Sequence, residues 1–221
     1  MTRTQPLPAV DAVRRCLEID DLGDHVRTTI ILSTILDTAP AQLWPLLTAP
    51  DRLRTWYGPV AGDFSEHGTL RTATGADVQV LEVEAPHKLS LAWRSGGSDD
   101  PVLIRLDPED DGSCELRLRH ATLMPRSDFD RCGPGIVAIG WEVALLALAA
   151  ATDAWRAGCL IAAPAPTAHW LAGPEGRAHV RAWAVRWAAE AVAAGVDERV
   201  ARAGEAETIR LVSAGLVSAR T

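Results

Sequence analysis

Residues 131–158 contain the most apolar stretch of the chain, and this stretch limits the folds that the chain can adopt. The segment reads RCGPGIVAIGWEVALLALAAATDAWRAG, and Glu142 is its only charge between Arg131 and Asp153. Pro134 suits the first turn of a helix and Gly158 suits its end, so we expect one long helix. Two apolar stripes recur at helical spacing, one on each face: Val137, Trp141, Ala144, Leu145, Leu148, Thr152 and Trp155, and opposite them Ile136, Ile139, Val143, Leu146 and Ala150.

A helix that is apolar all round either spans a membrane or is buried on two sides. A span requires about 20 apolar residues, whereas the apolar part of this helix covers only residues 136–151 and contains Glu142. Basic residues do not closely flank both of its ends. We therefore expect the helix to be buried within the protein, with no membrane as a partner.

Composition excludes several classes of function. A net charge of −7 argues against nucleic acid and anionic membranes as partners. The four cysteines are scattered without metal-site spacing, and the first residues lack a signal-peptide pattern, so we expect free thiols, no metal and a cytoplasmic location. The sequence contains no phosphate-binding glycine loop, HExxH or GxSxG motif, and we expect no cofactor.

The order of the expected elements indicates an α+β fold. After a lead at residues 1–24, with a short helix at 9–17, the sequence predicts a strand at 25–36, short helices at 39–47 and 50–56, and then a run of strands. These strands fall at 63–65, 69–74, 78–84, 88–94, 102–106 and 114–122, and SGGSDD at 95–100 is expected to be a solvated loop. Clean alternation in the last strand is typical of an antiparallel sheet with one wet face.

The tail is expected to be helical. A helix is predicted at 174–194, with a tryptophan-rich stripe, followed by two shorter helices at 197–203 and 205–214. One sheet can cover only one face of the long helix, so we expect the tail to pack on the other face, either in the same chain or in a homodimer. The chain would then divide into a first domain at 1–165 and a helical extension at 166–221.

Three segments resemble a known superfamily. They are ILDTAPAQLWPLLTAPDRLRTW (35–56), VQVLEVEAPHKLSLAW (78–93) and GWEVALLALAA (140–150). Together they resemble the START-like (SRPBCC) superfamily, and within it the homologues of the heat-shock-protein ATPase activator and the polyketide-cyclase-like proteins. The resemblance implies a helix-grip fold, in which an antiparallel sheet curls around a long C-terminal helix and leaves an apolar cavity. SEHGTLR (65–71) departs from the Gly-Gly pair that family members usually carry there, and the tail lies outside the common domain.

The residues expected to face this cavity form the candidate ligand site. They are Trp44, Trp56, Leu89, Leu91, Trp93, Leu116, Leu118, His120, Val137, Trp141 and Leu145. His120 is the most informative, because it falls on an otherwise leucine face, where it either bonds a backbone carbonyl or contacts a ligand. For Glu142 we expect an ion pair with Arg181 or Arg186 of the tail.

These observations favour a protein that binds a small hydrophobic molecule, without a cofactor or a covalent intermediate. One alternative is an enzyme of the cyclase or aromatase kind, in which His120 supplies acid or base help in the same cavity. A second is a co-chaperone-like interaction module, as the family name suggests. Binding is preferred to catalysis because no catalytic constellation is present in the sequence.

Overall fold

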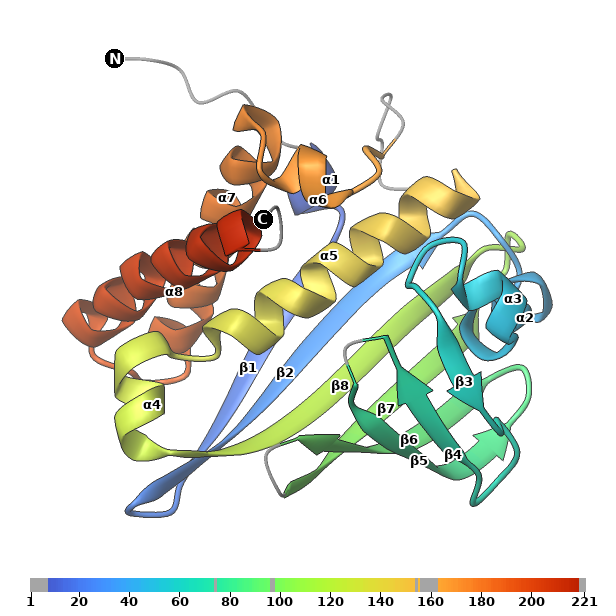
Figure 1. Ribbon diagram of the computed structural model, residues 1–221, viewed down its shortest axis with the longest axis horizontal. Helices are drawn as coiled ribbons and strands as arrows, with labels where there is room; N and C mark the ends of the chain where they lie inside the picture. Colours follow the sequence, from blue (N-terminus) through green and yellow to red (C-terminus); the bar gives the residue numbers. More distant parts are fainter. Residues whose placement is uncertain (1–7, 74, 96–97, 154, 156–162, 219–221) are drawn as a thin grey trace.

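The computed structural model describes residues 8–73, 75–95, 98–153, 155 and 163–218, and these form an α+β structure (Figure 1). Eight strands make one sheet in the order β1-β2-β8-β7-β6-β5-β4-β3, and a helix, α5, lies diagonally across its concave face. The strands are β1 (Arg14–Asp21), β2 (His25–Leu36), β3 (Val60–Gly62), β4 (Thr69–Thr72), β5 (Asp77–Glu84), β6 (Lys88–Ser95), β7 (Ser98–Pro108) and β8 (Cys114–Pro125). The helices are α1 (Pro8–Asp11), α2 (Pro40–Thr48), α3 (Pro50–Leu53), α4 (Arg126–Cys132), α5 (Gly135–Thr152), α6 (Ala168–Leu171), α7 (Pro174–Ala193) and α8 (Glu198–Ser218).

The sheet is antiparallel throughout, and its centre is the pairing of β2 with β8. These strands pair over their full lengths, from His25 opposite Pro125 to Leu36 opposite Cys114. Leu116 and Leu118 are buried, whereas Arg117 and Arg119 are exposed. The period of two along a strand therefore separates a face that packs on α5 from a face in water, as the alternation predicts.

The core helix α5 is shorter than the sequence predicts. Gly133, with φ of +57°, ends α4, and Pro134 is the N-cap of α5, so the segment from 131 does not form one helix. Asp153, with φ of +49°, takes the left-handed conformation that ends a helix. The expected end at Gly158 lies outside the described residues.

By length and composition, α5 is the one described helix that could cross a membrane. Half of its residues are buried inside the protein. Leu145 and Leu148 belong to the main core with Leu116 and Leu118 of the sheet. The helix is thus the central element of the core.

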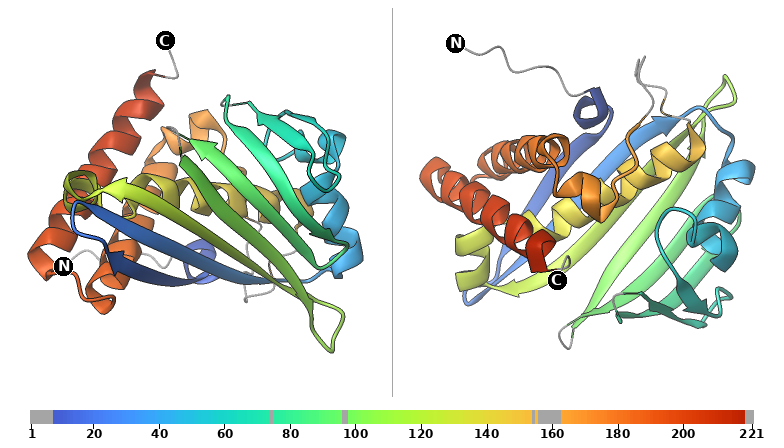
Figure 2. Two further views of the ribbon diagram at one scale, coloured as in Figure 1. Left: turned by 90° about the horizontal axis from the view of Figure 1, so that it is seen from below. Right: turned by 45° about the horizontal axis from the view of Figure 1, so that its top comes forward.

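The face of α5 that points away from the sheet is partly covered by the tail of the same chain. Ile139 and Leu146 are buried in one cluster with Trp183 and Trp187 of α7, and α7 lies beside α5 and β1 (Figure 2). Ile136 does not follow this pattern: its side chain is 53% exposed. The expected second stripe is therefore only partly covered, because the tail packs along one side of α5 and leaves a strip open.

Glu142 pairs with Arg15 of β1, not with Arg181 or Arg186 of the tail. Its Oε1 lies 2.5 Å from Arg15 Nε, and its Oε2 lies 2.9 Å from Nη2. The indole Nε1 of Trp187 also donates to Oε1 at 3.0 Å. Burial raises the pKa of the Glu142 carboxyl, and the charge and hydrogen bonds of Arg15 and the indole of Trp187 oppose this rise. Arg186 pairs instead with Asp11 at the surface.

Three further expectations about the elements are wrong. The segment 9–17 is not a helix beyond Asp11, since residues from Arg14 onward form edge strand β1 beside β2. The expected loop 95–100 contributes Ser98, Asp99 and Asp100 to β7, which pairs directly with β6. The strand expected at 63–65 lies at Val60–Gly62.

The two short helices expected at the end of the chain form one helix, α8. Gly204 lies inside this helix and does not end it. The lack of a side chain at Gly204 instead allows α8 to pack closely against the turn between α4 and α5. A Cβ at position 204 would lie 3.2 Å from the carbonyl carbon of Cys132 and from the nitrogen of Gly133. Gly204 therefore lets two backbones approach each other instead of ending a helix.

Candidate functional site

Three adjoining cavities lie beside α5, and Tyr57 lines all of them. The inner cavity, of about 70 Å³, is lined by Leu47, Leu53, Trp56, Tyr57, Val60, Phe64, Leu70, Thr72, Val78, Leu89, Leu91, Trp93, Ile104 and Trp141. The middle cavity, of about 300 Å³, is lined by Tyr57, Trp93, Asp100, His120, Thr122, Val137, Gly140, Trp141 and Ala144. The outer groove, of about 590 Å³, is lined by residues 55–57, Thr72, Ala73, small residues of α5 and residues 165–167.

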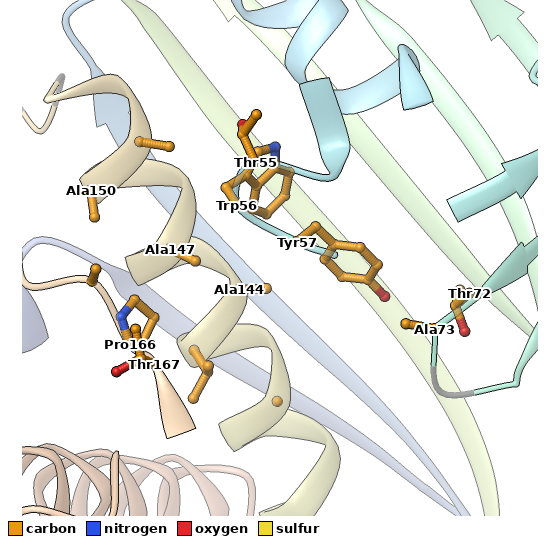
Figure 3. Close-up of a pocket in the computed structure, with 14 residues that line it drawn as sticks. Thr55, Trp56, Tyr57, Thr72, Ala73, Ala144, Ala147, Ala150, Pro166 and Thr167 are labelled. Atoms are coloured by element: carbon orange, nitrogen blue, oxygen red, sulfur yellow. The ribbon is translucent and has the colours of Figure 1, made fainter. Parts of the chain in front are cut away.

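The outer groove follows the open strip of α5. Figure 3 shows Ala144, Ala147 and Ala150 on this helix, with Trp56 and Tyr57 on one side of it and Pro166 and Thr167 on the other. Small side chains leave room along the helix, and Tyr57 stands between the groove and the middle cavity. The three spaces therefore meet at one aromatic side chain.

The structure brings seven of the eleven predicted lining residues to the inner or middle cavity. Trp56, Leu89, Leu91, Trp93 and Trp141 line the inner cavity, and His120 and Val137 line the middle cavity with Trp93 and Trp141. Leu116, Leu118 and Leu145 are instead buried in the main core under α5. Trp44 packs against both core clusters without lining a cavity wall. Because α5 crosses the sheet diagonally (Figure 1), different parts of it meet different surroundings: Leu145 packs in the main core with Leu116 and Leu118, whereas Val137 and Trp141 line the middle cavity with His120.

Sequence reasoning missed several lining residues. Tyr57 and Phe64 lie in irregular segments, where no period indicates which side chains face inward. Asp100, expected in a solvated turn, is only 6% exposed and lines the middle cavity. Asp100 belongs to β7 because it pairs with Trp93 of β6. The glycine-rich sequence at 95–100 gives no indication of this pairing.

His120 and Trp141 form a hydrogen-bonded pair at the boundary of the inner and middle cavities. Trp141 Nε1 donates to His120 Nδ1 at 2.8 Å, and the two rings meet edge to face with centroids 5.9 Å apart. His120 is 6% exposed, and its Nε2 is buried without a hydrogen-bond partner. A buried donor left without a partner costs roughly 1–3 kcal/mol. Neither ring nitrogen of His120 bonds a backbone carbonyl, which is one of the two arrangements expected for this residue.

Burial shifts the pKa values of two side chains that line these cavities, His120 and Tyr57. Desolvation lowers the pKa of His120 to about 4, so its imidazole is neutral at pH 7. Desolvation also raises the pKa of the Tyr57 phenol to about 12. Asp100 is the one acidic residue that lines the cavities, and no lysine or arginine lines them among the described residues.

Within the described part of the chain, no cluster of three or more His, Cys, Asp or Glu side chains could hold a metal ion. Cys16, Cys114 and Cys132 are free thiols, and burial raises the pKa of Cys114 to about 11. Cys114 lies in the main core and lines none of the three cavities. The site is therefore built from aromatic and aliphatic walls with a few polar groups, which include His120 and Asp100.

Comparison with known proteins places this geometry in context. Residues 37–153 match the family described as Activator of Hsp90 ATPase homolog 1-like protein. The crystal structure of CalU16 from Micromonospora echinospora is similar, with a TM-score of 0.61 and 25% identity over 81% of this chain and 98% of that one. SA2116 from Staphylococcus aureus, titled a protein of unknown function, has a TM-score of 0.52 and 10% identity over 59% of this chain and 96% of that one. PFC0360w, an HSP90 activator from Plasmodium falciparum, has a TM-score of 0.39 and 18% identity over 42% and 71%. No curated protein sequence matches the chain.

Proposed function

The chain belongs to the Activator of Hsp90 ATPase homolog 1-like family and has a START-like helix-grip fold, and from this premise we propose that it binds a small apolar molecule between the sheet and α5. The observation that carries the proposal is the middle cavity of about 300 Å³, which shares Tyr57 as a lining residue with the aromatic inner cavity and the outer groove. Ligand sites in proteins are typically concave, mostly apolar and of about this size or larger.

The walls favour a flat ligand. Trp93 and Trp141 meet edge to face with ring centroids 5.9 Å apart, and both line the inner and middle cavities. Flat aromatic faces stack on planar molecules and bury apolar area, which contributes about 25 cal/mol per Å². A molecule of two or three fused rings would fit the middle cavity and reach toward Tyr57.

The same groups argue for binding over cyclase-like catalysis. His120 Nδ1 already accepts the hydrogen bond of Trp141, so this nitrogen is not open to take a proton from a substrate. With a pKa of about 4, His120 is also almost never a proton donor at pH 7. An enzyme using this cavity would need another acid or base, and the buried carboxyl of Asp100 is the remaining acidic group.

A cavity-filling substitution tests the proposal. Ala144 lines both the middle cavity and the outer groove, so Ala144→Phe would fill the space that the ligand requires. Exposed Ala193 on α7 offers a matched control, Ala193→Phe. Thermal shift and calorimetry with a panel of fused-ring aromatic probes should give binding to the wild type and to the control, and binding weakened about tenfold or more by Ala144→Phe.

Two results would contradict the proposal. One is the failure of every probe to stabilise the wild-type protein. The other is equal affinity of a stabilising probe for the Ala144→Phe variant and the control, which would place the probe elsewhere on the molecule. Chemical turnover of a bound probe that is lost in an Asp100→Asn variant would favour the cyclase-like alternative.

A further inference from the structure

The hydrogen bond from Trp141 determines where His120 carries its proton. An indole nitrogen can only donate, so His120 Nδ1 at 2.8 Å must present its lone pair. The neutral imidazole then carries its hydrogen on Nε2. This nitrogen is a buried donor without a partner, in a residue that is 94% buried and lines the middle cavity.

The arrangement differs from that of exposed His87 and buried His179, whose ring nitrogens contact backbone oxygens. His87 and His179 each place Nδ1 3.0 Å from a backbone carbonyl oxygen, which can only accept, so their hydrogens lie on Nδ1. Trp141 is therefore a positioning residue: it holds the His120 ring and leaves the Nε2 hydrogen for a second partner.

The surroundings restrict what that partner can be. No lysine or arginine lines the cavities within the described residues, and His120 itself is uncharged at pH 7, so an anion entering would lose its hydration without gaining a counter-charge. A neutral oxygen, such as that of a ketone or quinone, accepts a hydrogen bond at a much smaller desolvation cost. The aromatic walls of Trp93 and Trp141 fit the flat ring system that would carry this oxygen.

We propose that His120 Nε2 donates a hydrogen bond to a neutral carbonyl-type oxygen of the ligand, and that this bond makes the cavity selective for planar ketones over matched hydrocarbons and carboxylates. The inference rests on the proposed binding function and names its ligand class. A site that hydrogen-bonds its ligand rejects an analogue without the polar group, because the buried protein donor is then left unpaired.

Paired probes test this selectivity. α-Tetralone and tetralin share a ring system and differ by one carbonyl, and naphthoate supplies a charged comparison. Calorimetry on the full chain should show α-tetralone binding about tenfold more tightly than tetralin, with naphthoate weaker than α-tetralone. In His120→Phe the preference for α-tetralone over tetralin should disappear, because the Nε2 donor is gone.

The design separates failure of this inference from failure of the binding function. If tetralin and α-tetralone bind wild type equally, a water or no partner satisfies Nε2, and the inference is overturned while the binding function stands. If neither probe binds, the result contradicts both the inference about His120 and the proposed binding function. Equal ketone preference in wild type and His120→Phe would also overturn the inference.

A second measurement keeps the inference testable if His120→Phe does not fold. In nitrogen-detected NMR of the wild type, His120 should show its hydrogen on Nε2, in contrast to His87 and His179. Addition of α-tetralone should deshield the Nε2 hydrogen of His120, and tetralin should not. Trp141→Phe keeps an aromatic ring but removes the indole donor, and it should reduce the ketone preference; an unchanged preference together with an unshifted Nε2 hydrogen would contradict the proposal.

Discussion

The Oε1 atom of Glu142 lies 2.5 Å from Nε of Arg15, and this ion pair joins the core helix to the edge strand β1. The two side chains are 1% and 5% exposed, and Trp187 of α7 donates to the same oxygen. Because burial raises the pKa of Glu142 in spite of Arg15, desolvation outweighs the attraction between the charges. The pair therefore links three elements without itself being a large source of stability.

Substitution of one partner should be far more damaging than substitution of both. Arg15→Met leaves the Glu142 carboxylate buried without its counter-charge, and we expect a loss of about 3–5 kcal/mol in the free energy of unfolding. Arg15→Met combined with Glu142→Gln removes both charges and keeps an oxygen that can accept from Trp187. Urea unfolding of the double variant should give a stability within about 1 kcal/mol of wild type.

The exposed pair of Arg186 with Asp11 provides the control for this cycle. Arg186→Met should change the free energy of unfolding by no more than about 1 kcal/mol, because an exposed ion pair is worth little. If Arg15→Met lowers the free energy of unfolding no more than Arg186→Met does, the buried Arg15–Glu142 pair is not required to link α5 to β1.

Alternation and family resemblance predict the central part of the fold. The strands at His25–Leu36 and Cys114–Pro125 carry a clear period of two, and their pairing holds the sheet together. The segment around Trp141 is too apolar to be exposed, and it lies over the concave face as expected. The match of residues 37–153 to the family agrees with the resemblance that the same segments carry.

The parts that sequence does not predict depend on contacts between distant segments. The inward face of strand β1 consists of Arg15, Leu17 and Ile19. The charged Arg15 breaks the apolar alternation that would predict a strand, and its inward position makes sense only with its buried partner Glu142. The cavity position of Asp100 likewise depends on pairing across β6. The division of the eleven predicted lining residues between cavity and core depends on the angle at which α5 crosses the sheet, which no local pattern specifies.

Tyr57 is the only tyrosine of the chain, so its ionisation can be followed directly. Burial raises its pKa from 10 to about 12. The unfolded chain loses this proton first, so stability should fall as pH rises from about 10 to 12. We expect the phenolate absorbance of the folded protein to appear with a midpoint near pH 12, and near pH 10 in denaturant. A folded midpoint near 10 would mean that Tyr57 is open to solvent and does not separate the three cavities.

His120 should make the protein less stable in mild acid. Its pKa is lowered from 6.5 to about 4, so between these values the unfolded chain binds more protons than the folded one. Stability is then complete above pH 6.5 and falls as the pH drops toward 4, by about 1.4 kcal/mol per pH unit at most. Urea unfolding at a series of pH values should show this slope in wild type and in the surface variant His25→Gln, and a smaller slope in His120→Phe. Equal slopes in all three proteins would contradict the neutral, buried state of His120.

Deletion of residues 166–221 should cause aggregation or prevent folding. The tail covers Ile139 and Leu146 of α5, and its removal would expose them to water together with the Arg15–Glu142 pair. Trp183→Ala is a milder version and should lower the free energy of unfolding by about 3–5 kcal/mol. Its neighbour Val185 is 42% exposed, so Val185→Ala should have an effect within about 0.5 kcal/mol. A soluble, monomeric truncation with an unchanged melting temperature would show that residues 1–165 fold without the tail.

Two glycines of α5 give the sharpest test of how the tail docks. A Cβ at Gly135 would lie 1.9 Å from Thr208 Oγ1 of α8, whose hydroxyl donates to the Cys132 carbonyl at 3.1 Å, whereas a Cβ at Gly140 would meet nothing within 4 Å. Gly135→Ala must therefore displace α8 or break that bond, and we expect a loss of about 1–3 kcal/mol. Gly140→Ala should instead leave stability unchanged or raise it by up to about 1 kcal/mol, because alanine favours a helix. Since both substitutions add the same methyl group to the same helix, urea unfolding that shows equal effects would mean that α8 does not pack against the start of α5.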